Sequence, residues 1–163
     1  MTREHASSNL TFDHLWQFSL QYYGVREVKE ACLNLQNHYH GNVNLLLLLK
    51  CLDEQALRFN AEDWHHVQSC LGRTEKLLHQ FRDIRRQLKH SVVDSLYREA
   101  LEFELSLEKQ QQSDLVDCIN ALTLSPQQGE ALVLGYCRQL GAEHLGLSSP
   151  NPSANSLPNK HHT

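Results

Sequence analysis

Helix-breaking residues are scarce in this sequence. Its 163 residues include only 7 glycines and 4 prolines, and three of those prolines follow residue 148. Because glycine and proline interrupt regular structure, their scarcity favours long helices. No segment alternates Val, Ile or Thr with polar residues as a half-buried strand does. The sequence therefore predicts an all-α protein with no sheet.

Long apolar runs are also absent. The longest is Leu45–Leu49, whereas about 20 apolar residues are needed to cross a bilayer. Residues 1–16 contain no apolar stretch of the kind that a secretory signal requires. The five cysteines are widely spaced and form no CxxC pair, as is typical of free thiols in a reducing compartment. We therefore expect a cytoplasmic protein that does not contact membranes.

Recognisable catalytic and metal-binding motifs are missing. The sequence contains no HExxH, no GxSxG and no glycine-rich phosphate loop. Among its 11 histidines, His38 and His40 would point about 200° apart on a helix. Glu62 and His65 form one carboxylate–imidazole pair, whereas a di-iron bundle needs two. We therefore expect no catalytic residue, no metal ligand and no cofactor.

The apolar periodicity predicts about six helices. They are expected at about 11–23, 25–40, 43–59, 61–89, 92–112 or beyond, and 125–140. The helices at 61–89 and from residue 92 are the two long ones, and Gly72 can bend the first of them. Asn42 or Asn44 can cap the third helix. Ser125 and Pro126, followed by Gln128, resemble a capping box that opens the last helix.

These helices predict a single domain over residues 11–147, built as an irregular helical bundle. Residues 1–10 are polar and are expected to be loose. Residues 148–163 contain three prolines and almost nothing apolar, so we expect a disordered tail.

The first three predicted helices carry a recognisable pattern. It reads Leu15-Trp16, Phe18-Ser19-Leu20, Gly24-Val25, Cys32-Leu33, Leu35-Gln36, Gly41, and Val43-Asn44-Leu45-Leu46-Leu47. This pattern resembles that of a family of small proteobacterial proteins of unknown function, over roughly residues 15–110. The resemblance implies a helical fold and a cytoplasmic bacterial origin, and it adds no mechanism.

Two amides adjoin the most apolar segments, Gln36 and Asn44. The simpler interpretation makes Asn44 a helix cap and Gln36 a partly exposed amide. The alternative is a small polar pocket beside Trp16, in which the amides bind a ligand within an otherwise apolar site.

Basic residues gather on one face of the fourth predicted helix. We call Arg82, Arg85, Arg86 and Lys89 the basic stripe; they follow the i, i+3, i+4, i+7 spacing of one helical face. The next helix is acidic between residues 99 and 117. If the two helices run antiparallel, Arg82 lies opposite Ala100, within reach of Glu99 or Glu102, and the charges pair on solvated faces. Otherwise the stripe stays free to bind phosphates or an acidic partner.

Three classes of function follow. Broad apolar helix faces without a catalytic motif favour a non-enzymatic protein that contacts another protein, or a second copy of itself as a homodimer. A ribosome- or RNA-associated factor that uses the basic stripe is the alternative, which the net charge of −4 disfavours. An enzyme or small-ligand binder with an unrecognised helical site is the remaining class.

Overall fold

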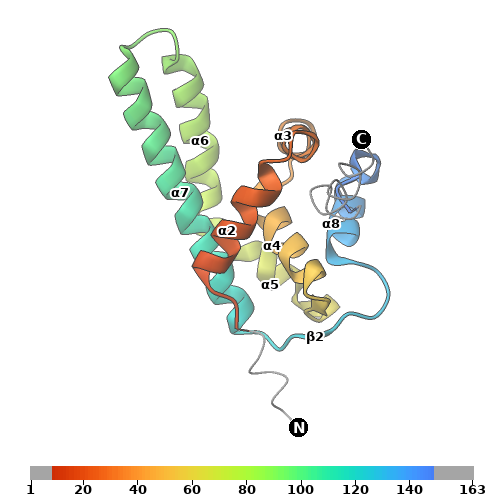
Figure 1. Cartoon of the computed structure of the whole chain (residues 1–163). Coiled ribbons are helices and arrows are strands. Elements are labelled where there is room, and N and C mark those ends of the chain that lie inside the picture. Colours follow the sequence, from red (N-terminus) through yellow and green to blue (C-terminus); the bar gives the residue numbers. More distant parts are fainter. Residues whose placement is uncertain (1–8, 149–163) are drawn as a thin grey trace, which may run out of the picture.

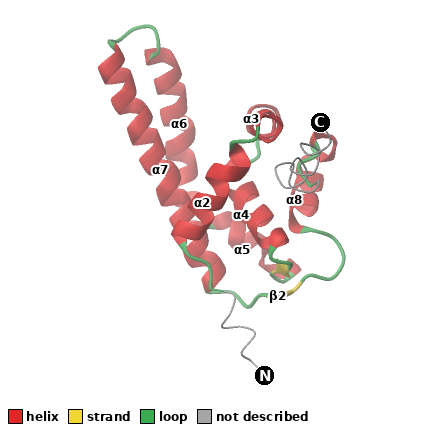
Figure 2. Cartoon of the chain, in the orientation of Figure 1, coloured by secondary structure: helices red, strands yellow, loops and turns green. Residues whose placement is uncertain are grey.

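The computed structural model describes residues 9–148. In this range the chain forms seven α-helices, two 3-10 helices and one two-stranded antiparallel sheet (Figure 1, Figure 2). The α-helices are α2 (Phe12–Tyr23), α3 (Arg26–Tyr39), α4 (Val43–Glu54), α5 (Trp64–Ser69), α6 (Gly72–Leu88), α7 (Asp94–Asn120) and α8 (Leu132–Leu140). The 3-10 helices are η1 (Ala61–Asp63) and η2 (Glu143–Leu145), and the strands are β1 (Leu57–Arg58) and β2 (Ser125–Pro126). The prediction of a mostly helical protein is confirmed, whereas those of no sheet and of about six helices are wrong.

The predicted loose segment and disordered tail fall almost entirely outside the described residues. At the start of the described range, Leu10 is buried. Its backbone N–H donates to Asn120 Oδ1 (3.0 Å), and its carbonyl accepts from Asn120 Nδ2 (2.7 Å). These two bonds attach the segment before α2 to the end of α7.

Helix α4 lies in the middle of the molecule, between α2 and α7 on one side and α8 on the other (Figure 1). Its leucines, Leu45–Leu49, are all buried, because a helix that is apolar all round needs cover on every side. Burying each leucine side chain contributes about 2 kcal/mol to stability. No helix within residues 9–148 is both long and apolar enough to span a membrane.

Helices α6 and α7 form a hairpin that extends beyond the other helices (Figure 1). The far end of α7 packs on α2, α4 and α5, and there its residues Leu115, Val116 and Ile119 are buried. Toward the turn of the hairpin most side chains of α7 are exposed, apart from Glu104. The hairpin is therefore anchored at one end and free at the other.

The two long helices differ from their predicted limits. The helix expected over 61–89 is divided into η1, α5 and α6, with the break at Cys70 and Leu71 just before Gly72. The helix expected from residue 92 runs without interruption from Asp94 to Asn120. It continues through the polar residues 109–113 because the amides of Gln111 and Gln112 are buried and hydrogen-bonded.

The capping box predicted at Ser125 is wrong. Ser125 and Pro126 instead form β2, which pairs with β1 after the third helix ends at Glu54. Helix α8 begins later, at Leu132, because the backbone N–H groups of its first turn donate to a side chain on α4. The carboxylate of Asp53 accepts the N–H groups of Leu132 (2.8 Å) and Val133 (3.0 Å).

Replacing Asp53 should therefore loosen α8. We expect Asp53→Ala to lower the free energy of unfolding by about 2 kcal/mol, because two helix N–H groups lose a charged acceptor. Urea denaturation measures the change. The exposed neighbour Glu54 provides the control, and equal effects of Asp53→Ala and Glu54→Ala would contradict the assignment.

Candidate functional site

A cavity of about 380 Å³ lies between α2, α3, α4 and the α6–α7 hairpin. Its apolar lining consists of Trp16, Leu20, Tyr23, Leu33, Val43, Leu47 and Leu105. Its uncharged polar lining consists of Ser19, Gln36, Asn44 and Gln112. Its charged lining consists of Arg82, Arg85, Arg86, Glu104 and Glu108. The cavity thus has a large apolar wall and one strongly charged side.

Six of the seven candidate residues from the sequence line this one cavity. Trp16, Gln36 and Asn44, proposed as a polar pocket, share it with three members of the basic stripe: Arg82, Arg85 and Arg86. The fourth member, Lys89, is exposed and does not line it. Two groups that are separate in the sequence therefore line the same cavity.

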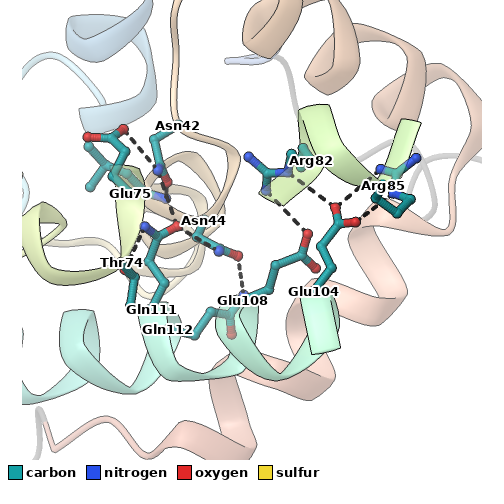
Figure 3. Close-up of polar contacts among 11 residues, drawn as sticks. Asn42, Asn44, Thr74, Glu75, Arg82, Arg85, Glu104, Glu108, Gln111 and Gln112 are labelled. Carbon is teal, nitrogen blue, oxygen red and sulfur yellow. Dashed lines mark hydrogen bonds and ion pairs between the residues drawn. The ribbon is translucent and has the colours of Figure 1, made fainter. Parts of the chain in front are cut away.

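A chain of buried polar side chains borders the cavity, most of it visible in Figure 3. We call Ser19, Gln112, Asn44, Gln111 and Thr74 the amide chain. Gln112 Nε2 donates to Ser19 Oγ (3.0 Å) and to Asn44 Oδ1 (3.1 Å). Asn44 Nδ2 donates to Gln111 Oε1 (2.9 Å), and Gln111 Nε2 donates to Thr74 Oγ1 (2.9 Å). The amide chain connects α2, α4, α6 and α7.

The interpretation of Asn44 as a helix cap is wrong. Asn42 caps α4 instead, since its Oδ1 accepts the N–H of Leu45 (2.8 Å). Asn44 lies inside the helix, 8% exposed. Its amide is held by two partners on α7 rather than by its own backbone.

One backbone group sets the orientation of these amides. Because Asn42 Oδ1 accepts from Leu45, Asn42 Nδ2 is left to donate to Gln111 Oε1 (3.2 Å). The same Gln111 oxygen receives Asn44 Nδ2, so Asn44 Oδ1 is turned toward Gln112 Nε2. Each amide fixes the next, since its carbonyl oxygen can only accept and its NH₂ group can only donate.

The side-chain amide of Gln112 lacks one hydrogen-bond partner. Gln112 is fully buried, and its Oε1 is the one buried side-chain polar atom in the described part of the chain that has no hydrogen-bond partner. Gln112 is one of the residues that line the cavity. Leaving a buried acceptor unpaired costs about 1–3 kcal/mol.

The charged side of the cavity is held together by Glu104. Its carboxylate accepts from Arg85 Nε (2.7 Å) and from Arg82 Nε (3.3 Å), and Arg82 also binds Glu108 (3.2 Å) (Figure 3). The hydrogen bond with Glu104 raises the pKa of Arg85. Burial raises the pKa of Glu108, against the opposing effect of Arg82. These pairs connect α6 to α7 beside the cavity.

The prediction that Arg82 pairs with Glu99 or Glu102 is wrong. The hairpin turn extends to Val93, and α7 begins only at Asp94. The facing residues on α7 are therefore further along the chain, at Glu104 and Glu108. The remaining stripe arginine, Arg86, forms an ion pair with Asp83 of its own helix (3.4 Å), and both side chains are about half exposed.

Sequence reasoning missed Gln112 and Glu104. Both lie on one stripe of α7, since Glu104, Glu108, Gln111 and Gln112 follow i, i+4, i+7, i+8 spacing and continue into buried Leu115. A polar stripe that continues into an apolar one was the available signal in the sequence that these polar side chains face the interior. The arrangement offers a ligand apolar surface, uncharged polar side chains and arginine side chains.

Residues 14–115 match the family described as "Protein of unknown function (DUF2390)". The chain belongs to this family. The DUF2390 match includes every residue that lines the cavity, from Trp16 to Gln112, whereas α8 lies outside it. No curated protein and no solved structure matches the chain.

The two glutamates of the cavity should differ in their contribution to stability. Glu104 is 7% exposed and serves two arginines, so we expect Glu104→Gln to lower the free energy of unfolding by about 3 kcal/mol. Glu108→Gln should cost less than about 1 kcal/mol, because burial already disfavours its charge. Urea denaturation near neutral pH compares them. A larger loss in Glu108→Gln than in Glu104→Gln would contradict the central role of Glu104.

Proposed function

We propose that the protein binds a small ligand in the cavity, and that this ligand has an apolar body and an N–H or O–H donor. One observation carries the proposal: Gln112, a residue that lines the cavity, has a buried Oε1 with no hydrogen-bond partner. Buried polar groups are nearly always paired. A ligand donor would pair this one without disturbing the amide chain, whose other groups already have partners.

The shape and lining of the cavity support a small molecule. Its volume of about 380 Å³ lies in the range of ligand pockets, which are mostly apolar with a few fixed polar groups. Trp16 and Tyr23 offer aromatic surfaces, and Leu33, Leu47 and Leu105 offer aliphatic ones. An aromatic or branched apolar body fits this lining.

The charges favour an acidic group on the ligand. Three arginines and two glutamates line the cavity, which leaves one net positive charge. Arg82 and Arg85 are bound to the glutamates. Arg86, whose contact with Asp83 is long and exposed, remains to bind a ligand carboxylate, sulfonate or phosphate.

The residues that line the cavity support ligand binding rather than catalysis. The glutamates of the lining are committed to arginines, and no histidine or cysteine lines the cavity. The free thiols of residues 32, 51, 70, 118 and 137 support a location in a reducing cytosol. RNA binding by the basic stripe has less support, because two of its four cations are paired with α7.

A second candidate is self-association through the α6–α7 hairpin. Seven of the nine large exposed apolar side chains in the described range belong to it: Leu77, Ile84, Val93, Leu96, Leu101, Phe103 and Leu105. Leu96 and Phe103 lie seven residues apart, on one face of α7. A second copy presenting the same face would cover both, as in a two-fold dimer.

A fluorescent probe tests the cavity. Anilinonaphthalene sulfonate combines an aromatic body, an amine N–H and an anion, so we expect saturable binding with one site per chain. Leu33→Trp should fill the cavity and weaken the probe affinity at least about tenfold. Fluorescence titration measures the dissociation constant.

Leu101→Trp is the matched control, because Leu101 is exposed to the same degree (39% against 37%) and does not line the cavity. Arg86→Gln should weaken the probe severalfold, and Arg98→Gln, which is exposed and outside the cavity, should not. Unchanged binding in Leu33→Trp would refute the ligand site.

Sedimentation velocity over a range of concentrations tests the second candidate. We expect reversible dimers that Leu96→Glu disrupts, because a charge would be buried at the contact. Leu101→Glu, about 140° around the helix from Leu96, should leave dimers intact. A monomer at every concentration rejects the candidate.

A further inference from the structure

A histidine and two cysteines meet where α5 approaches α7. A ring nitrogen of His66, Sγ of Cys70 and Sγ of Cys118 all lie within 4.8 Å of one another. Within residues 9–148 this is the one group of three such side chains close enough to share a metal ion. None of the three lines the cavity, so this cluster is separate from the ligand site proposed above.

Local structure places the first two side chains together. His66 and Cys70 are four residues apart, and the backbone N–H of Cys70 donates to the His66 carbonyl (3.2 Å), which closes a helical turn. Residues at this spacing lie one above the other on the same helical face. Val67, between them in the sequence, is fully buried and fixes α5 against the core.

The third side chain comes from a distant part of the sequence. Cys118 lies near the end of α7, is 6% exposed, and is within hydrogen-bond reach of Cys70. His66 is exposed and Cys70 is half-buried. The cluster therefore has a rigid inner side and an outer side that is open to solvent.

The donor set is selective for a particular class of metal. One imidazole nitrogen and two sulfurs suit zinc, which binds nitrogen at about 2.0–2.1 Å and thiolate at about 2.3 Å. Ligands of a tetrahedral zinc are then about 3.5 Å apart, so the three atoms need to move by only about 1 Å. Calcium and magnesium prefer oxygen ligands and do not suit this cluster.

We propose that His66, Cys70 and Cys118 bind one zinc ion that links α5 to α7, with water as the fourth ligand on the solvent side. Zinc replaces the thiol protons of both cysteines, and these two protons leave to solvent. The bound ion stabilises the folded chain, because the unfolded chain does not hold the three ligands together.

The surroundings of Cys118 agree with this site. Asp63 is close enough to act on Cys118 electrostatically, and its negative charge favours a nearby cation.

Cobalt(II) is a spectroscopic substitute for zinc and tests the site directly. The full chain, kept reduced with a phosphine that does not bind metal, is titrated with cobalt. We expect a thiolate-to-cobalt charge-transfer band and the visible bands of a tetrahedral ion, saturating at one equivalent. Added zinc should displace the cobalt and raise the melting temperature.

Matched variants identify the ligands. His66→Ala and Cys118→Ala should weaken metal binding by more than about a hundredfold, because the loss of an outer hydrogen-bond partner alone costs about 10–100-fold. His65→Ala, next to His66 but outside the cluster, and Cys51→Ala, at another buried thiol, should bind as the unmodified protein does.

The exposed His66 keeps the test decisive if Cys118→Ala fails to fold. No charge-transfer band in the unmodified protein, or an undiminished band in His66→Ala, would overturn the proposal. A melting temperature that zinc raises equally in His66→Ala and in His65→Ala would overturn it as well.

Discussion

The backbone N–H of Leu45 determines how the centre of the molecule is arranged. Its bond to Asn42 orients one amide, and that amide orients the next, through Gln111 and Asn44 to Gln112. A reversed amide anywhere along this path would place two donors or two acceptors against each other in a buried site, where unpaired polar groups are costly. The amide chain therefore fixes the position of α7 relative to α4, and the unpaired oxygen of Gln112 follows from it.

The position of α7 in turn determines the composition of the cavity. Gln112 and Glu104 lie two helical turns apart on the same stripe of α7. The first belongs to the amide chain, and the second holds Arg82 and Arg85 of α6. A shift of α7 by one turn would break the contacts of Gln112 with α4 and those of Glu104 with α6. The buried polar groups thus specify one alignment of helices whose apolar contacts alone would tolerate several.

Much of the fold and part of the site could be predicted from the sequence, because the relevant signals are local. Scarce glycine and proline indicate helices, and apolar Leu45–Leu49 indicates a central one. Trp16 and Gln36 were identified from their neighbours in the sequence. The partners of Arg82 could not be predicted, since a turn only a few residues longer changes which glutamates face it. The strand at Ser125 could not be predicted either, because the local capping signal is overridden by a carboxylate 79 residues away from Leu132.

The contact between Asp53 and α8 has a consequence for the order of folding. A helix of nine residues is too short to persist alone in water, and Ala131, its N-cap residue, offers no capping hydrogen bond. The acceptor for its first turn exists only once α4 has formed, and closing so long a loop is slow compared with forming a local turn. Helix α8 therefore depends on α4, which supplies the acceptor for its first turn.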